Sequence, residues 1–228
     1  MAKQQYFITG TDTDAGKTHV SVGLLKAAAR QGLRTFGVKP IAAGAEWVDG
    51  KLCNEDALRI QAAGSIALRY EQVNPVVFEP AIAPHIAAAQ EQKLVHVSRL
   101  EGFVRGTLLT PHDVALVEGA GGWRVPLNDR ELLSDLAKRL ALPVIVVVNM
   151  KLGCLNHAFL TMEAIRRDGL QVAGWVANGG QLDMPCYEEN LATLHTMLSA
   201  PLLGTLTWHD DGATAEAEFD LIWQNLAG

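Results

Sequence analysis

The sequence has few cysteines, no long apolar run and no excess of positive charge, and each shortage argues against a class of protein. Three cysteines in 228 residues form no CxxC pair, which is not a disulfide framework and predicts reduced thiols in a cytoplasmic protein. A formal net charge of −6 argues against nucleic acid or an anionic membrane as the main partner. No apolar run could span a bilayer, and the start does not resemble a signal peptide.

The motifs of zinc and nucleophilic catalysis are absent as well. The histidines show no metal-ligand spacing, and neither HExxH nor GxSxG occurs, so no nucleophilic triad is predicted. Hydrophobic residues make up 49% of the chain and charged residues 19%, which is ample for a sizeable core. The length favours one domain over residues 1–228, and no repeat or linker divides it.

Apolar runs alternate with helical patterns along the whole chain. The patterns predict strands over residues 6–9, 34–39, 113–118, 143–149, 172–178 and 202–206. They predict helices over residues 19–31, 54–63, 98–109, 131–140, 156–168, 187–198 and 216–226, with a further alanine-rich helical patch from His85. Because several strands are apolar without alternation, we expect a single α/β domain with a parallel sheet flanked by helices.

A phosphate-binding loop is predicted at residues 10–18, which read GTDTDAGKT between the first strand and the first helix. In such a loop, backbone N–H groups and the helix N-terminus converge on an anion. Lys17 would add positive charge at the β- and γ-phosphates, among neighbours expected to face solvent, and Thr18 could ligate Mg2+. Five residues separate Gly10 from Gly16 where the Walker A loop has four. Either Gly-Lys-Thr occurs by chance or the loop is a longer variant, and the order of elements favours the variant.

Two acids inside the loop, Asp12 and Asp14, stand where a polyanion should bind. They suggest contact with Mg2+, water or a cationic second substrate. The simpler alternative is that Asp14 caps a helix end.

Polar residues also follow the carboxyl ends of other predicted strands, where ligands of parallel sheets bind. Lys39 would place a second cation near a γ-phosphate, although a solvated lysine is the ordinary alternative. Glu118 precedes Gly-Ala-Gly-Gly in a Walker-B-like position and would bind Mg2+, the alternative being a helix cap. Asp56 is either a first-turn helix acid or a third Mg2+ ligand with Thr18 and Glu118.

With these residues in view, the sequence closely resembles the dethiobiotin synthetase family, the ATP-dependent cyclo-ligases of biotin synthesis. The family has the same five-residue gap in its phosphate loop. The matching segments cover nearly the whole chain in order, at residues 10–18 (GTDTDAGKT), 39–40 (KP), 54–57 (NEDA), 84–86 (PHI), 117–123 (VEGAGGW), 151–157 (KLGCLNH), 174–178 (GWVAN) and 200–204 (APLLG).

The resemblance implies a P-loop NTPase-like fold, a homodimer and closure of a cyclic urea from 7,8-diaminononanoate, CO2 and MgATP. One amine forms a carbamate, whose oxygen attacks the γ-phosphate to give a carbamic–phosphoric anhydride. The second amine then displaces phosphate and closes the ring. Such a path needs positioning and charge stabilisation rather than a protein nucleophile.

The resemblance also implies roles for individual residues. Catalysis would depend on Lys17, Lys39 and Thr13, and Mg2+ would be held by Thr18, Asp56 and Glu118. The nucleotide would contact Asp14, Ala15, Gly16, Lys17, Thr18, His19, Glu118, Gly121 and Asn178, with Asn178 on adenine. The diamine would contact Thr13, Lys39 and Ala43, and its carboxylate would bind the neighbouring subunit's turn formed by Gly153, Cys154, Leu155 and Asn156.

Three positions depart from the family. Where the family commonly has a serine near the diamine, after Lys39-Pro40, this chain has Ala42 and Ala43, so one hydrogen bond is lost or supplied by backbone. Asn190 stands where some members have a tyrosine on the carboxylate, with Tyr187 about one helical turn earlier. Thr207 replaces a proline of the adenine pocket. None of these departures touches the predicted phosphate and Mg2+ residues.

Two other functions share part of this pattern. A phosphate-loop switch ATPase acting on a partner protein would need the loop and the Mg2+ acid, but neither Lys39 nor the Gly153–Asn156 turn. Another amide- or urea-forming ligase of the same fold would differ in its acceptor.

Overall fold

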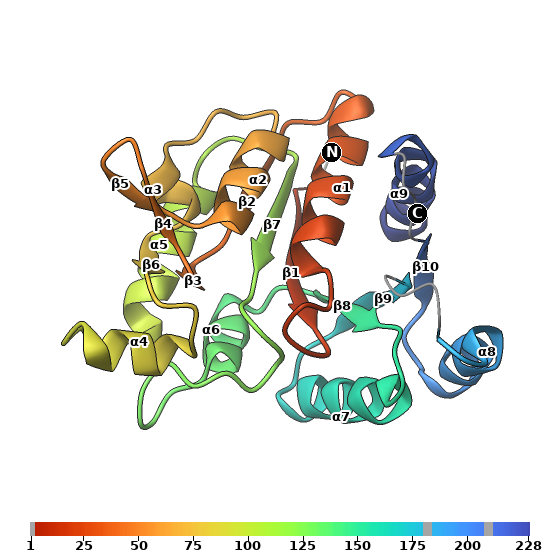
Figure 1. Ribbon diagram of the computed structural model, residues 1–228. Coiled ribbons are helices and arrows are strands. Elements are labelled where there is room, and N and C mark those ends of the chain that lie inside the picture. The colour runs from red at the N-terminus through yellow and green to blue at the C-terminus, as the bar shows by residue number, and fades with distance from the viewer. Residues whose placement is uncertain (1–2, 180–183, 208–211) are drawn as a thin grey trace.

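The computed structural model describes residues 3–179, 184–207 and 212–228 and contains a central six-stranded sheet (Figure 1). Every neighbouring pair of strands in this sheet is parallel. The predicted α/β fold is therefore confirmed, and each predicted strand is present. The strands lie in the order β10 (Leu202–Thr207), β9 (Val172–Gly179), β8 (Val144–Asn149), β1 (Gln4–Gly10), β7 (Val114–Glu118) and β2 (Thr35–Val38).

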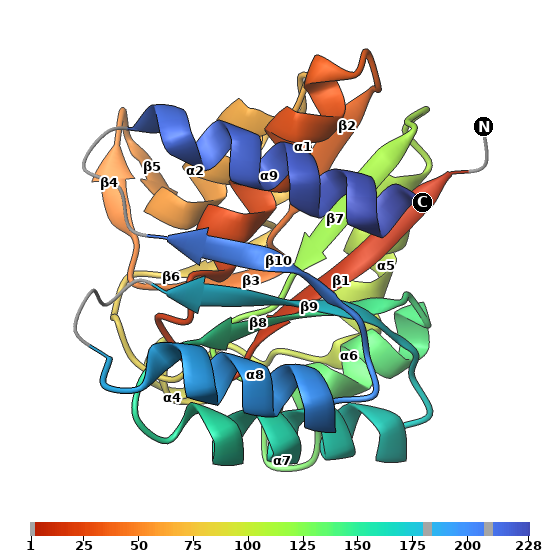
Figure 2. The ribbon, with the colours of Figure 1, turned by 90° about the vertical axis from the view of Figure 1, so that its right-hand side faces the viewer.

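Helices cover both faces of the sheet (Figure 2). One face is covered by α1 (Lys17–Arg30), α2 (Glu55–Ala63) and α9 (Gly212–Ala227). The opposite face is covered by α5 (Val97–Leu108), α6 (Leu133–Leu140), α7 (Cys154–Arg167) and α8 (Tyr187–Met197).

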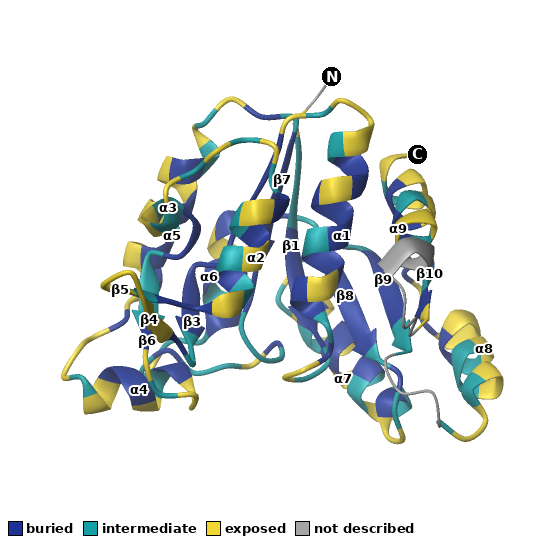
Figure 3. Cartoon of the chain, turned by 45° about the horizontal axis from the view of Figure 1, so that its top comes forward, coloured by how far each residue is buried: buried dark blue, intermediate teal, exposed yellow. Residues whose placement is uncertain are grey.

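The central strands lack polar alternation because both of their faces are buried (Figure 3). In β8, Val144, Val146 and Val148 belong to the hydrophobic cluster that includes α5, α6 and α7. Ile145 and Val147, which lie between them, belong to the cluster that includes α1 and α9. A strand buried in this way reads as a continuous apolar run, which is why the sequence pattern identified it.

A smaller group of strands between β2 and α5 was not predicted. It contains a parallel pair, β3 (Ile41–Ala43) with β6 (Val76–Phe78), and an antiparallel pair, β4 (Glu46–Val48) with β5 (Lys51–Cys53). The short helices α3 (Tyr70–Val73) and α4 (Pro84–Gln90) lie in the same region, and α4 is the predicted alanine-rich patch. Asp49 and Gly50 join β4 to β5 with φ angles of 49° and 75°, as a two-residue hairpin turn requires.

The three cysteines are free thiols: Cys53 and Cys154 are buried, and Cys186 is exposed. Across the part of the chain that the structure describes, no helix combines the length and apolar character needed to cross a bilayer.

Candidate active site

The predicted phosphate loop connects β1 to α1, and two glycines allow its tight path. Gly16 has a φ of +90°, a conformation that glycine adopts without strain. A Cβ at Gly16 would lie 2.1 Å from Nδ2 of Asn178. A Cβ at Gly10 would lie 2.9 Å from the Cβ of Ala15. The loop therefore folds closely over its own residues and against the end of β9.

Lys17, the first residue of α1, lies beneath the loop with 6% of its surface exposed. Its Nζ donates a hydrogen bond to the main-chain oxygen of Asp12 at 3.0 Å. Burial lowers the pKa of Lys17, and the nearby Glu118 carboxylate offsets only part of that effect. The expectation that the neighbours of Lys17 face solvent is wrong, because Ala15 and Thr18 are buried. The loop packs over them as α1 enters the core.

Glu118, the last residue of β7, is a buried carboxylate that accepts three side-chain hydrogen bonds. Its Oε1 accepts from Thr18 Oγ1 at 2.7 Å and from Lys39 Nζ at 2.8 Å. Its Oε2 accepts from Ser21 Oγ at 2.6 Å. A buried charge is costly unless it is paired and hydrogen-bonded. Because Glu118 is only 1% exposed, these three contacts are needed to stabilise its carboxylate.

Lys39 joins Glu118 to a second carboxylate, since its Nζ also donates to Asp56 Oδ2 at 2.8 Å. Burial lowers the pKa of Lys39, but Glu118 and Asp56 more than offset it and hold the pKa above its usual value. Burial raises the pKa of Asp56, but Lys39 more than offsets it and holds the pKa below its usual value. Lys39 therefore presents a fixed positive charge at neutral pH. We call Lys17, Thr18, Lys39, Asp56 and Glu118 the phosphate-loop cluster.

The donor atoms of this cluster fit Mg2+. Thr18 supplies a hydroxyl within hydrogen-bonding reach of the carboxylates of Glu118 and Asp56. Mg2+ is a hard cation that commonly takes one or two carboxylates and leaves its other positions to water and phosphate oxygens. Among the described residues, no three His, Cys, Asp or Glu side chains form a metal-binding group. The site therefore suits an ion shared with a phosphate ligand rather than one enclosed by protein.

A cavity of about 900 Å3 opens beside the phosphate loop and collects most of the predicted residues. This is the size of a small-molecule site. Glu118 does not line the cavity itself but accepts hydrogen bonds from two residues that do, Thr18 and Lys39. Ala15 is buried within the loop. The predicted residues that line the cavity are Thr13, Asp14, Gly16, Lys17, Thr18, His19, Lys39, Ala43, Asp56 and Gly121.

The remaining predicted residues lie outside this cavity. Asn178 donates from Nδ2 to the main-chain oxygen of Ala15 at 2.9 Å, so its amide approaches the loop from the side of β9. Four residues at the start of α7, which we call the α7 turn, line no part of the cavity in their own chain: Gly153, Cys154, Leu155 and Asn156. Within this turn Cys154 is buried, whereas Gly153 and Asn156 are exposed.

The departures from the family have contacts of their own. Asn190 donates from Nδ2 to the main-chain oxygen of Cys186 at 2.7 Å, within α8. The Thr207 hydroxyl donates to Glu218 Oε1 at 2.5 Å, which ties β10 to α9.

Two side chains of the site were not singled out in the sequence. Ser21 lies three residues after Thr18 on α1, and Arg59 lies three residues after Asp56 on α2 and lines the cavity. Positions i and i+3 share a helix face, so this spacing was the available signal. Lys151 was expected beside the phosphate loop, because it follows the end of a predicted strand. Its partner was not predicted: Lys151 pairs with Asp12 Oδ2 at 3.2 Å, between segments 139 residues apart.

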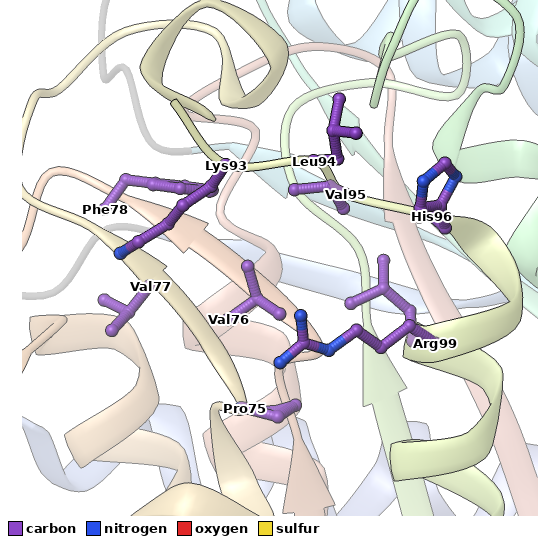
Figure 4. Close-up of a pocket in the computed structure, with 10 residues that line it drawn as sticks. Pro75, Val76, Val77, Phe78, Lys93, Leu94, Val95, His96 and Arg99 are labelled. Carbon is purple, nitrogen blue, oxygen red and sulfur yellow. The ribbon is translucent and has the colours of Figure 1, made fainter. Parts of the chain in front are cut away.

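A second cavity, of about 390 Å3, lies between β6 and the start of α5 and is lined by none of the predicted residues (Figure 4). Its basic side chains are already engaged. Lys93 and His96 pair with carboxylates, and Arg99 lies over the ring of Phe103, with Cζ 5.6 Å from the ring centroid. The cavity beside the phosphate loop is therefore the candidate active site.

Relatives in sequence carry the name of a biosynthetic enzyme. A family model described as an AAA domain matches residues 4–215. The ATP-dependent dethiobiotin synthetase of Cellvibrio japonicus is 57% identical over 206 residues, which cover 90% of this chain and 90% of the relative. That of Marinobacter nauticus is 52% identical over 217 residues, which cover 95% of this chain and 93% of the relative.

Solved structures with the same fold are much more distant in sequence. The cell division ATPase MinD of Pyrococcus furiosus has a TM-score of 0.61 at 17% identity, covering 100% of this chain and 99% of that one. The septum site-determining protein MinD of Pyrococcus horikoshii, complexed with Mg-ADP, has a TM-score of 0.59 at 18% identity, covering 100% and 98%. At these identities the likeness shows the P-loop NTPase fold alone.

Proposed function

The chain belongs to the family of ATP-dependent dethiobiotin synthetases and is a cyclo-ligase of biotin biosynthesis, and from that premise we propose how its residues close the ring. The substrates are 7,8-diaminononanoate, CO2 and ATP, and the products are dethiobiotin, ADP and phosphate. The observation that carries the assignment is the phosphate-loop cluster, in which Lys17, Lys39 and Asp56 line one cavity and the buried Glu118 carboxylate accepts from Lys39. This arrangement suits phosphoryl transfer, which depends on positioning and on electrostatic stabilisation.

We assign the triphosphate to Lys17 and to the backbone N–H groups of the loop and of α1. Lys17 is a buried cation whose Nζ is held by one main-chain oxygen, and a phosphate oxygen is a stronger acceptor than a carbonyl. Gly16, His19 and Gly121 line the space around it, with Asp14 at the cavity rim. Asn178 would recognise adenine, since its amide reaches the loop from β9.

The Mg2+ ion would be held by Thr18, Asp56 and Glu118, and when bound it neutralises charge on the phosphate oxygens. Lys39 lies between the two carboxylates and remains charged, so its ammonium can stabilise a carbamate oxygen or the transferring phosphoryl group. Thr13 lines the same cavity, and its hydroxyl would donate a hydrogen bond to the carbamate or γ-phosphate.

In the reaction, one amine adds to CO2 and loses a proton, which gives a carbamate. A carbamate oxygen bonds to the γ-phosphorus as the bond to ADP breaks, which gives the carbamic–phosphoric anhydride. The second amine bonds to the carbamate carbon, phosphate leaves, and loss of a proton completes the ring. The protein contributes no nucleophile to this path, and its cationic cluster lines the cavity in which charge develops.

We propose that the chain works as a homodimer in which the α7 turn binds the substrate carboxylate for the neighbouring subunit. The exposure of Gly153 and Asn156, outside the cavity of their own chain, supports this assignment. A helix N-terminus with glycine before it offers N–H groups suited to a carboxylate. Ala43 lines the cavity near the expected position of the diamine, where a main-chain group would replace a serine hydroxyl.

We also propose one domain over residues 1–228 and a cytoplasmic location. The two hydrophobic clusters share the central sheet, which supports one folding unit. Cys53 and Cys154 are buried free thiols, which is typical of reducing compartments.

The test is an assay of purified protein with MgATP and bicarbonate, with and without 7,8-diaminononanoate. Phosphate release is followed together with dethiobiotin by mass spectrometry. Phosphate that depends on the diamine and equals dethiobiotin one for one is expected. Diamine-independent ATP hydrolysis without product would favour the switch ATPase, and product from a different diamine alone would favour another ligase.

A further inference from the structure

Asp12, in the phosphate loop, makes contacts through each of its oxygen atoms. Its main-chain oxygen accepts from Lys17 Nζ at 3.0 Å. Its Oδ1 accepts from the N–H of Thr13 at 2.8 Å. Its Oδ2 pairs with Lys151 Nζ at 3.2 Å. Lys17 and Lys151 are thus both bound to one residue of the loop, Lys17 to its main chain and Lys151 to its carboxylate.

The segment that ends in Lys151 holds the loop at other points as well. The N–H of Thr11 donates to the main-chain oxygen of Val147 at 2.9 Å, and the N–H of Asn149 donates to Thr11 Oγ1 at 3.2 Å. Asn149 Nδ2 donates to the main-chain oxygen of Asp14 at 3.5 Å. The outer side of the phosphate loop therefore lies against the end of β8, and Lys151 is the only charged contact in this series.

The pair of Lys151 and Asp12 is too exposed to matter much for folding. The side chains are 34% and 45% exposed, and ion pairs of that exposure contribute little to the free energy of unfolding. The pair has a different consequence, because the same residue, Asp12, also holds the Lys17 ammonium through its main-chain oxygen. Fixing the Asp12 carboxylate fixes the peptide whose oxygen holds Lys17.

We propose that Lys151 is a positioning residue for nucleotide binding, which acts through Asp12 to set the shape of the phosphate loop and the place of Lys17. Lys151 does not itself bind the phosphates. Lys151 lies two residues before the α7 turn, and its main-chain oxygen accepts from the N–H of Cys154 at 2.9 Å, so it also connects that turn to the loop. The proposal rests on the proposed function for the identity of the ligand, a Mg2+-bound nucleoside triphosphate.

The discriminating variant is Asp12→Asn. On charge alone, removal of a carboxylate beside a polyanion site should strengthen ATP binding. The amide keeps an acceptor for the Thr13 N–H but loses the ion pair, so our proposal expects the opposite. ATP affinity, measured by calorimetry with Mg2+ on the full chain, should fall about tenfold, which is about 1.4 kcal/mol of binding free energy. Stronger ATP binding by Asp12→Asn would overturn the proposal.

Lys151→Met should weaken ATP binding by a similar factor, whereas Lys151→Arg, which keeps the charge, should retain most of the affinity. Lys138→Met removes a comparable exposed pair with Asp135 on α6, distant in the chain from the loop, and should change neither affinity nor melting temperature. If Lys151→Met lowers the melting temperature more than Lys138→Met while leaving ATP affinity unchanged, the role is structural and the proposal is wrong.

The double variant Lys151→Met with Asp12→Asn separates action through Asp12 from direct contact with the nucleotide. If Lys151 acts through Asp12, the double variant should bind ATP no more weakly than the weaker-binding single variant. Additive losses would show that Lys151 reaches the phosphates directly and would overturn the proposal. Because the readout is ATP affinity, it stands apart from the ring-closure assay, which tests the proposed function in the wild-type protein.

Discussion

The phosphate-loop cluster and the α7 turn are both proposed to bind substrate, but they differ in how far one chain completes them. In the cluster, Glu118 and Lys39 are at most 5% exposed, and their polar atoms are paired within the chain. In the α7 turn, Gly153 and Asn156 are exposed and line no part of the cavity. Groups that must stabilise developing charge are preorganised by folding of one chain. Groups that hold the carboxylate end of the substrate can instead be brought to the site when a second subunit binds.

The largest effect is expected from Lys17→Met, which removes the buried cation of the loop but keeps its apolar stem. Turnover should fall about a thousandfold, because a charge-stabilising donor is lost. Circular dichroism should show the native fold, since the methionine side chain fills the same space. Lys26→Met, on the exposed side of the same helix, serves as the control and should retain full turnover. Turnover retained by a folded Lys17→Met protein would remove the phosphate-loop assignment.

Glu118→Gln tests whether the cluster is held by its buried charge. The buried Lys39 ammonium would lose one of its two carboxylate partners, so the free energy of unfolding should fall by on the order of 3 kcal/mol. Urea unfolding at pH 7 measures this change. Glu101→Gln, which removes a half-buried carboxylate on the surface helix α5 that pairs with Arg105 and Arg139, should change unfolding far less. Equal losses in both variants would show that burial does not distinguish the cluster.

Asn156→Ala addresses the other side of the comparison. The KM for 7,8-diaminononanoate should rise about tenfold, because a hydrogen bond to a charged group is lost, while kcat and the KM for ATP stay close to wild type. Steady-state kinetics with each substrate varied in turn checks this split. An unchanged KM for the diamine would show that the α7 turn does not hold the carboxylate.

Mixing two differently impaired subunits sharpens the comparison further. In a dimer of Lys17→Met with Asn156→Ala, a shared site would combine an intact phosphate loop from one subunit with an intact α7 turn from the other. Activity at low diamine should therefore rise when the two variants are mixed and allowed to exchange. No recovery in a verified mixed dimer would place the whole site in one chain.

The smallest effect concerns pH. The pKa of Asp56 is below its usual value in the folded protein because Lys39 more than offsets burial, so ionised Asp56 favours folding. That contribution is present above the unfolded pKa of about 4 and disappears as pH falls through the lower folded value. The stability difference between wild type and Asp56→Asn should therefore shrink between pH 5 and strongly acidic pH. A difference independent of pH would contradict the ion pair.

Sequence reasoning identified the sheet because its strands carry a signal that burial on both faces produces, as in Val144–Asn149. It placed Lys39, Glu118 and Asn178 near the loop because parallel strands end at one edge. It missed β4 and β5, although the Asp49-Gly50 pair that joins them is a recognised turn signal.

Other features of the site depend on contacts that local sequence does not encode. Nothing in the chain indicates that Lys39 bridges Asp56 and Glu118, because each partner lies on a separate element. The role of Ser21 and the partner of Lys151 became clear only when the structure placed Glu118 and Asp12 beside them. The sequence can predict which residue types lie at the carboxyl-end edge of the sheet, but only side-chain distances show which of them act together.

The close approach of Gly16 to Asn178 limits how nucleotide preference can be redesigned. The Asn178 amide already fills the space that a Cβ at residue 16 would need, and it bonds to the preceding peptide oxygen. A longer side chain at position 178 would press against Gly16, displace the phosphate loop from the end of β9 and impair catalysis along with base choice. Smaller replacements at position 178, or changes at the β10 side around Thr207, leave the loop in place. An engineer who wants a different base should begin there.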